Sequence, residues 1–166
     1  MNGSLNVYTA NVKNGKELTV EEKPEQIEGG LAVDDRGQIQ FCNNFDFKNI
    51  RRFYAVLNHE PNFVRAWHGH KKETKYVFVI TGAVIVAAVK IDNWEKPNKN
   101  TAVQRFVLSE KKSCILKIPA GYANGFKTLT PDTKIIFFST VTLEESLKDD
   151  YRFEAQYWNP WDIEER

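Results

Sequence analysis

Residues 65–70 read Arg-Ala-Trp-His-Gly-His and place two of the three histidines of this chain two positions apart in a strand-like stretch. Because the side chains of a β-strand repeat every second residue, His68 and His70 project from one face, close enough to act on one small molecule or one metal ion. A second segment, residues 118–126, reads Ile-Pro-Ala-Gly-Tyr-Ala-Asn-Gly-Phe. Together the two segments predict a small β-barrel with a polar pocket in its mouth.

The composition favours one all-β domain that binds a small ligand. A chain of 166 residues can bury one core without disulfides, and 13% aromatic content with eleven Phe suits half-buried sheet surfaces. The formal net charge is +1, and the charges are spread along the chain. No nucleic-acid stripe or polybasic membrane patch is therefore expected, and a small neutral or locally anionic ligand fits better.

Cysteine usage and apolar runs predict a soluble cytoplasmic protein. Cys42 and Cys114 lie far apart in the sequence and form neither a metal-type pair nor a disulfide framework. The first residues lack the layout of a signal peptide, and the longest apolar run, residues 76–89, is broken at Thr81-Gly82 and is too short to span a bilayer.

Alternating apolar residues and turn signals predict many short strands, as in sandwiches and barrels. Thr81-Gly82 reads as a hairpin turn, and residues 58–62 read as a second turn. Only residues 17–26 and 143–151 look helical. The expected strands are a hairpin at 31–41 and segments 51–58, 63–70, 75–80, 83–91, 103–108, 114–118, 125–129 and 134–141.

His68 is the candidate general base, because an imidazole can take and return a proton near neutral pH. Removing a proton from carbon requires a neighbouring carbonyl whose enolate oxygen meets a fixed positive charge, and Lys75 is the candidate for that charge. Two alternatives stay open for the histidines: a metal site through His68 and His70, or exposed strand residues without a role. Lys75 is otherwise a solvated strand end.

Three arginines, Arg51, Arg52 and Arg65, precede or open the histidine strand and could hold a diphosphate bidentately. The alternative is surface salt bridges. By strict alternation Arg65 and Trp67 face away from His68. Either the strand bulges here, or Arg65 serves the pocket of a neighbouring subunit.

Both segments resemble the dTDP-4-dehydrorhamnose 3,5-epimerases and their relatives, the dTDP-sugar 3,4-ketoisomerases. Residues 118–126 resemble the epimerases' Ile-Pro-x-Gly-Phe-Ala-His-Gly-Phe, and residues 65–68 resemble their Arg-Gly-x-His, whose histidine is the base. Lys75 falls where their enolate-stabilising lysine lies. Residues 51–54 and 65–72 look more like the ketoisomerases, which carry Arg-x-Phe-Tyr and Arg-Gly-x-His-Ala-His-Lys.

The resemblance covers about residues 31–141 and implies a cupin-type double-stranded β-helix, a jelly-roll barrel. We expect a single cupin domain over 1–166 with a C-terminal tail at 142–166. Family members pair as dimers that exchange edge strands, so residues 31–41 are candidates for crossing to a partner in a homodimer.

Departures from the family pattern leave the reaction open. The epimerases place a catalytic tyrosine after the last long strand, but residues 140–145 contain none, and the nearest is Tyr151. Their barrel histidine is Asn124 here, which also removes the third imidazole of metal-binding cupins, while Glu73 comes too soon after His70 to be their carboxylate. No metal and no cofactor are expected. Asp150 or Asp162 could replace the carboxylate that partners the base.

Inversion at carbon needs a base on one face and a proton donor on the other, whereas a carbonyl can be moved by one base alone. One base without an evident opposite acid favours ketoisomerisation. The overall resemblance nevertheless implies an epimerase of a 4-keto-6-deoxy nucleotide sugar in surface-polysaccharide biosynthesis, with a 3,4-ketoisomerase, a catalytically silent binder and a metal-dependent cupin such as a dioxygenase as alternatives. Its expected partner is a nucleotide-diphosphate sugar, without nucleic acid or membrane. The expected catalytic residues are His68, Lys75 and Tyr54, and the expected substrate-binding residues are Arg51, Arg65, His70, Tyr122 and Asn124, with Tyr54 or Tyr122 as the proton donor.

Overall fold

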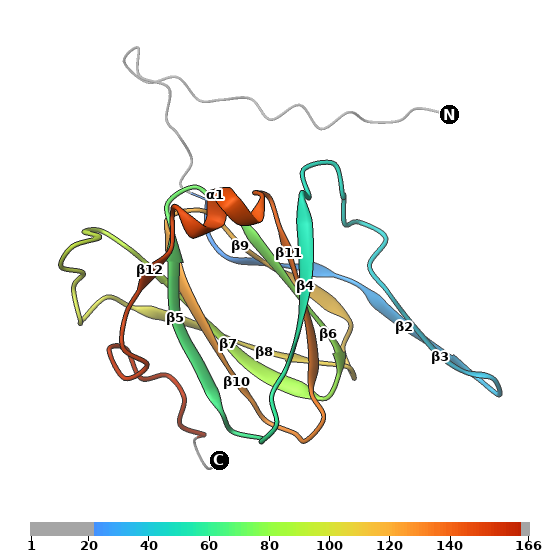
Figure 1. The fold of residues 1–166 in the computed structure, drawn as a ribbon. Helices are drawn as coiled ribbons and strands as arrows, with labels where there is room; N and C mark the ends of the chain where they lie inside the picture. Colours follow the sequence, from blue (N-terminus) through green and yellow to red (C-terminus); the bar gives the residue numbers. More distant parts are fainter. Residues whose placement is uncertain (1–21, 164–166) are drawn as a thin grey trace, which may run out of the picture.

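Two five-stranded antiparallel sheets face each other in the computed structural model, which describes residues 22–163 (Figure 1). The predicted all-β fold is confirmed. The first sheet has the order β1 (Glu25–Glu28), β9 (Cys114–Ile118), β6 (Lys75–Thr81), β11 (Lys134–Ser139) and β4 (Arg52–Leu57). The second has the order β12 (Tyr151–Arg152), β5 (Val64–His70), β10 (Tyr122–Thr128), β7 (Ala83–Lys90) and β8 (Val103–Ser109).

The turn at Gly82 joins the two sheets instead of closing a hairpin. β6 pairs with β9 and β11, whereas β7 pairs with β8 and β10. The predicted hairpin is therefore wrong. Gly82 has φ +82°, and a side chain there would lie 2.5 Å from the hydroxyls of Thr130 and Thr133. The turn thus carries the chain across the barrel, from one sheet to the other.

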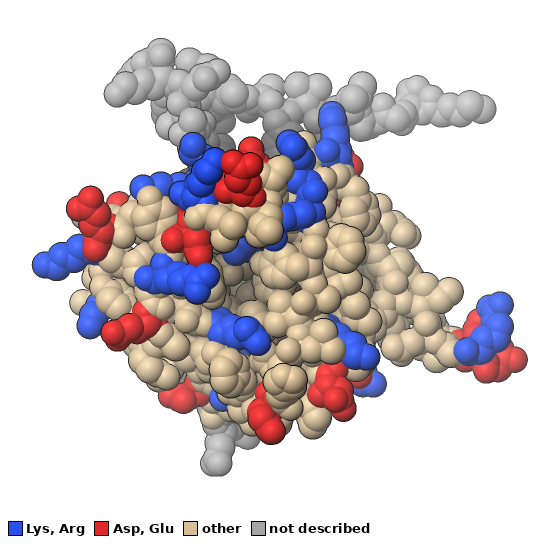
Figure 2. Space-filling model, in the orientation of Figure 1, with Lys and Arg blue, Asp and Glu red and all other residues tan. Residues whose placement is uncertain are grey.

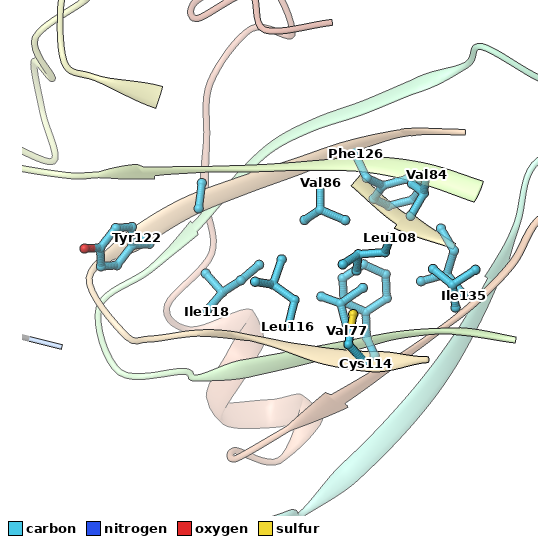
Figure 3. Packing of buried hydrophobic residues seen from close by; sticks show 13 residues of the cluster. Val77, Val84, Val86, Leu108, Cys114, Leu116, Ile118, Tyr122, Phe126 and Ile135 are labelled. Carbon is cyan, nitrogen blue, oxygen red and sulfur yellow. The ribbon is translucent and has the colours of Figure 1, made fainter. Parts of the chain in front are cut away.

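β7 is buried on both of its faces, which explains its unbroken apolar sequence. Val84, Val86 and Ala88 belong to the core between the sheets, part of which Figure 3 shows. Ile85, Ala87 and Val89 belong to a second cluster on the outer face. The C-terminal segment covers that face with Trp158 and Trp161, so this part of residues 142–163 packs against the sheet.

A bulge in β5 decides which side chains enter the barrel. Asn124 pairs with His68, but Phe126 pairs with Arg65, so two residues of β5 lie opposite Gly125 alone. A Cβ atom on Gly125 would lie 2.4 Å from that of Ala66, and only glycine permits this approach. The bulge brings Arg65 onto the same wall as His68. Of the two explanations for Arg65, the structure supports the bulge.

The helical predictions are largely wrong. The predicted helix at 143–151 is reduced to α1 (Leu143–Leu147), which a capping box between Thr142 and Glu145 begins, and the chain enters β12 at Tyr151. Of the predicted helix at 17–26, Glu25 and Gln26 lie in β1, where they pair with β9, and residues 17–21 lie outside the described residues. No helix in residues 22–163 is long and apolar enough to cross a membrane.

The predicted hairpin at 31–41 forms an arm that stands away from the barrel (Figure 1). It consists of β2 (Gly30–Asp34) and β3 (Gly37–Phe41), which pair only with each other. Its alternating apolar side chains are exposed: Leu31, Val33, Ile39 and Phe41. Charged side chains gather at its tip (Figure 2).

Candidate functional site

A cavity of about 180 Å³ opens between the two sheets. Five of the predicted site residues line it. The second sheet contributes His68 and Arg65 from β5 and Asn124 from β10, and the first contributes Tyr54 from β4 and Lys75 from β6. The base candidate and the two other catalytic candidates therefore lie on opposite walls. The remaining lining residues are Val56, Phe126 and Phe137.

The inward positions of the first sheet explain why polar groups enter an otherwise apolar interior. In β6, Lys75, Val77 and Val79 are buried at every second position, so Lys75 takes the first core-facing place of its strand. In β4, Tyr54 takes an inward position by the same alternation. The ring of Tyr54 is stacked on that of Phe137, with ring centroids 5.2 Å apart. Both polar side chains are thus held by packing from neighbouring strands.

His68 lies beside a carboxylate that favours its role as a base. Its Nδ1 atom is 3.6 Å from Oδ1 of Asp150, longer than a hydrogen bond, as is common for catalytic contacts in unliganded enzymes. A carboxylate on the Nδ1 side leaves Nε2 as the proton-accepting nitrogen. Burial and the charge of Lys75 lower the pKa of His68, which Asp150 partly opposes. The imidazole is therefore neutral at physiological pH.

Asp150, and not Asp162, is the carboxylate beside the base. Asp150 also accepts a hydrogen bond of 2.8 Å from Nε of Arg152. Burial raises the pKa of Asp150, but that hydrogen bond and the arginine charge outweigh it and hold the pKa below its usual value. Asp162 lines a larger cavity of about 640 Å³ on the outer face beside β8, away from His68.

Burial shifts the pKa values of Lys75 and Tyr54 in opposite directions. Burial lowers the pKa of Lys75, and the charge of Glu73 opposes that effect. Burial, followed by the charge of Glu73, raises the pKa of Tyr54, so its phenol keeps its proton. Tyr54 can therefore act as a proton donor and not as a base.

Arg65 and Asn124 bound the cavity on the side of the histidine. The amide nitrogen of Asn124 donates a hydrogen bond of 3.4 Å to the carbonyl oxygen of His68. Arg65 is exposed, and its Nε donates to Oδ1 of Asn58 at 2.8 Å. Its guanidinium lies 5.7 Å from the ring centre of Phe63. Arg65 is thus a cation at the rim of the cavity.

Three predicted site residues do not line the cavity. His70 is buried under α1, with Nδ1 3.2 Å from Oε2 of Glu73. Tyr122 lies at one end of the core, where its hydroxyl points away from the cluster (Figure 3). Arg51 precedes β4, whereas Arg65 contacts the residue after the end of β4, so roughly 20 Å of strand separate them. One diphosphate cannot reach both arginines.

Three apolar residues of the cavity were missed: Val56, Phe126 and Phe137. Their strands were predicted, and alternation through Tyr54 would have placed Val56 on the same inward face. Phe126 follows Asn124 by two residues in the regular register of β10 with β7, so alternation through Asn124 would have placed it as well.

The two histidines contact different carboxylates, Asp150 and Glu73, and do not converge on one point. Among residues 22–163, no three His, Cys, Asp or Glu side chains come together in a way that could hold a metal ion. The residues present therefore do not fit the metal site of a metal-dependent cupin.

The sequence matches the family described as dTDP-4-dehydrorhamnose 3,5-epimerase over residues 30–157. The solved epimerase of that name from Bacillus anthracis str. Ames, with TDP and PPi bound, is similar with a TM-score of 0.68 and 21% identity, covering 86% of each chain. The one from Sulfolobus tokodaii has a TM-score of 0.66 and 21% identity, covering 82% of this chain and 80% of that one.

A ketoisomerase has the same fold. The QdtA 3,4-ketoisomerase from Thermoanaerobacterium thermosaccharolyticum, a double mutant in complex with TDP, has a TM-score of 0.61 and 19% identity, covering 84% of this chain and 94% of that one. No curated protein matches the sequence significantly. These similarities confirm the predicted cupin-type jelly roll, which epimerases and ketoisomerases share.

Proposed function

The chain belongs to the dTDP-4-dehydrorhamnose 3,5-epimerase family, a group of isomerases, and we propose that it epimerises a 4-keto-6-deoxy nucleotide sugar. The observation that carries this choice is the position of Tyr54, which lines the cavity from the sheet opposite His68. Inversion requires a base on one face of the sugar and a proton donor on the other. The pair supplies both.

In the proposed reaction His68 removes the proton on the carbon beside the ketone. The electron pair moves onto the carbonyl oxygen, where the Lys75 ammonium stabilises the enolate. Tyr54 then gives a proton to the same carbon from the opposite face, and the ketone forms again. Asp150 stabilises the imidazolium that forms in the first transfer. After the second transfer His68 gives its proton to water and Tyr54 takes one back, which restores both groups for the next turnover.

The cavity accommodates a sugar ring and leaves the nucleotide outside. Val56, Phe126 and Phe137 supply an apolar wall for the 6-methyl group, and Asn124 supplies a hydrogen-bonding group. At the rim, Arg65 is the proposed ligand of the diphosphate. We assign no such role to Arg51, His70 or Tyr122. The proposed setting is surface-polysaccharide precursor synthesis in the cytoplasm, which the family suggests.

Ketoisomerisation is the second candidate. The segment after β11 carries no tyrosine between residues 140 and 145, where the epimerases have their acid. If Tyr54 did not donate a proton, His68 would return the proton that it had removed, on the same face of the sugar, and the carbonyl would move along the ring.

Incubation with a 4-keto-6-deoxy nucleotide sugar in deuterated water decides between the two candidates. Proton NMR follows the carbon-bound protons during the reaction. We expect deuterium at carbon 3 or carbon 5, with inverted configuration at the labelled carbon. A carbonyl moved to carbon 3 would instead identify a ketoisomerase. Absence of both exchange and conversion with every such sugar would leave a catalytically silent binder.

We further propose that two copies pair through the arm and the outer face of the first sheet. That face exposes Phe53, Leu57 and Ile80, and the arm exposes Val33 and Ile39. Apolar side chains in such number on neighbouring elements are unusual on a monomer. Crossing of the arm to a second copy would cover them.

The double variant Val33→Lys/Ile39→Lys is expected to sediment with the mass of one chain, while the unmodified protein sediments as two. Charges placed in the apolar interface would have to be desolvated there. Val107→Lys, at an exposed position of β8 in the other sheet, is the matched control and should leave the mass unchanged. An unmodified protein with the mass of one chain contradicts the dimer.

A further inference from the structure

A buried charged cluster lies between the cavity and α1, and its centre is Glu73. The side chain of Glu73 is fully buried in the turn between β5 and β6. Its Oε1 accepts a hydrogen bond of 3.1 Å from Nη2 of Arg52, and its Oε2 accepts one of 2.8 Å from Oγ of Ser146 on α1. The proposed reaction uses none of these three residues. Burial of a carboxylate costs desolvation free energy, so the presence of Glu73 in this cluster needs a physical explanation.

The strand register supplies the reason. Arg52 of β4 and Lys75 of β6 both pair with Ser139 of β11, so the two residues lie in one row across the sheet. Two strand spacings, about 10 Å, separate their backbones, and both side chains point inward from alternating positions. Two cations in one buried row repel each other, and burial disfavours each of them. A negative charge close to both offsets that cost.

We propose that Glu73 is a positioning residue of the site: its buried carboxylate fixes Arg52 and keeps the Lys75 side chain in the cavity wall as an ammonium ion. The inference rests on the proposed function, because Lys75 stabilises an enolate oxygen only while it carries a proton. Glu73 itself does not line the cavity and acts through Lys75.

The charges that face Lys75 agree with this role. Burial lowers the pKa of Lys75, and the charge of Glu73 is the largest effect that raises it. Arg52 from β4 lowers the pKa, and Asp150 before β12 raises it. On β5, burial lowers the pKa of both His68 and His70, so the two imidazoles are neutral and add no charge. Removal of the Glu73 charge therefore leaves burial and Arg52 largely unopposed.

A merely structural alternative is that Glu73 anchors α1 through Ser146. The two roles differ in what they do to Lys75. Ser146→Ala removes the bond to the helix but leaves the carboxylate charged. Glu73→Gln removes the charge but keeps an amide that can still bond Ser146. Only a change in charge alters the titration of Lys75.

The test follows the carbon beside the Lys75 ammonium by NMR in protein labelled with ¹³Cε-lysine, with Lys75→Met to assign the signal. In Glu73→Gln we expect the titration midpoint of Lys75 to fall by about one pH unit, the lower end of the effect of a close opposite charge. Ser146→Ala should leave it unchanged. The alkaline limb of the pH–rate profile should move to lower pH in Glu73→Gln only.

Removing one partner of a buried ion pair can unfold a protein, so a second comparison includes the double variant that neutralises both partners. Arg52→Gln should raise the Lys75 midpoint, because it removes a repelling charge. The double variant Arg52→Gln/Glu73→Gln should bring the midpoint below that of Arg52→Gln alone. Equal midpoints in these two variants, or in Glu73→Gln and the unmodified protein, overturn the proposal.

The titration uses no substrate and so separates this inference from the reaction itself. A midpoint that falls in a protein without activity on any 4-keto sugar supports the role of Glu73 and overturns the reaction. An active enzyme whose midpoint does not move overturns the role of Glu73 alone.

Discussion

His68→Asn is expected to lower the rate of deuterium uptake from solvent into a 4-keto-6-deoxy nucleotide sugar by about 10²- to 10⁴-fold. Asparagine is close to imidazole in shape at Nδ1, so it preserves the contact with Asp150, but it cannot take a proton from carbon. Binding of dTDP, measured by calorimetry, should stay within a few-fold, because the imidazole lines the sugar cavity and not its rim.

Arg65→Ala is the contrasting control for this variant. Loss of the guanidinium should weaken dTDP binding first and leave the exchange rate at saturating substrate closer to that of the unmodified enzyme.

The rate of deuterium exchange should fall at low pH as His68 becomes protonated, because only the neutral imidazole can act as the base. The midpoint of this acid limb of the pH–rate profile should lie below the ordinary imidazole pKa, since burial and the charge of Lys75 lower the pKa of His68. Full exchange in His68→Asn would remove the base from the mechanism.

The sequence predicted the strands better than their pairing. Alternation and turn residues are local signals, and they located β4 to β11 within a few residues. Whether the strand after Gly82 pairs with its predecessor or crosses to the other sheet depends on long-range contacts that no local pattern contains. The bulge opposite Gly125 is of the same kind, since it becomes visible only once β10 lies beside β5.

The same limit explains which site residues could be predicted. His68, Lys75 and Asn124 were found through motif spacing and lie in one cavity. His70 shares the inward face of β5, but its position two residues nearer to α1 carries it into contact with Glu73. Periodicity thus predicted on which face of its strand a side chain lies. It did not predict how far along the barrel that side chain lies. The choice of Asp150 over Asp162 likewise needed the fold of the tail.

The cluster around Glu73 shows what occupies an acid that the sequence offered only as a poorly spaced metal ligand. In the sequence, Glu73 stands close enough to His70 to suggest coordination, with spacing as the objection. In the fold, its oxygens are occupied by Arg52 and Ser146, while Nδ1 of His70 lies 3.2 Å away. A carboxylate already shared among these groups has little capacity left for a metal.

Lys75→Met is expected to reduce turnover by about 10²- to 10³-fold, the typical effect of losing one fixed group that stabilises an oxyanion. Methionine has a similar length and suits a buried position, so the barrel should keep its circular dichroism spectrum. The substrate carries no enolate charge when it binds, and KM should therefore change much less than kcat. Steady-state rates and single-turnover exchange at carbon measure the two effects.

Lys75→Arg separates charge from geometry in the same assay. Arginine keeps the positive charge, but its planar head group is larger than an ammonium and must fit a cavity of about 180 Å³. We expect a rate between those of the unmodified enzyme and Lys75→Met. If Lys75→Met kept a kcat within tenfold of the unmodified enzyme, the enolate oxygen would have to be stabilised by another group. Arg65 and Asn124 are the remaining donors on the opposite wall, and the sugar would then bind with its ketone toward β5 and away from β6.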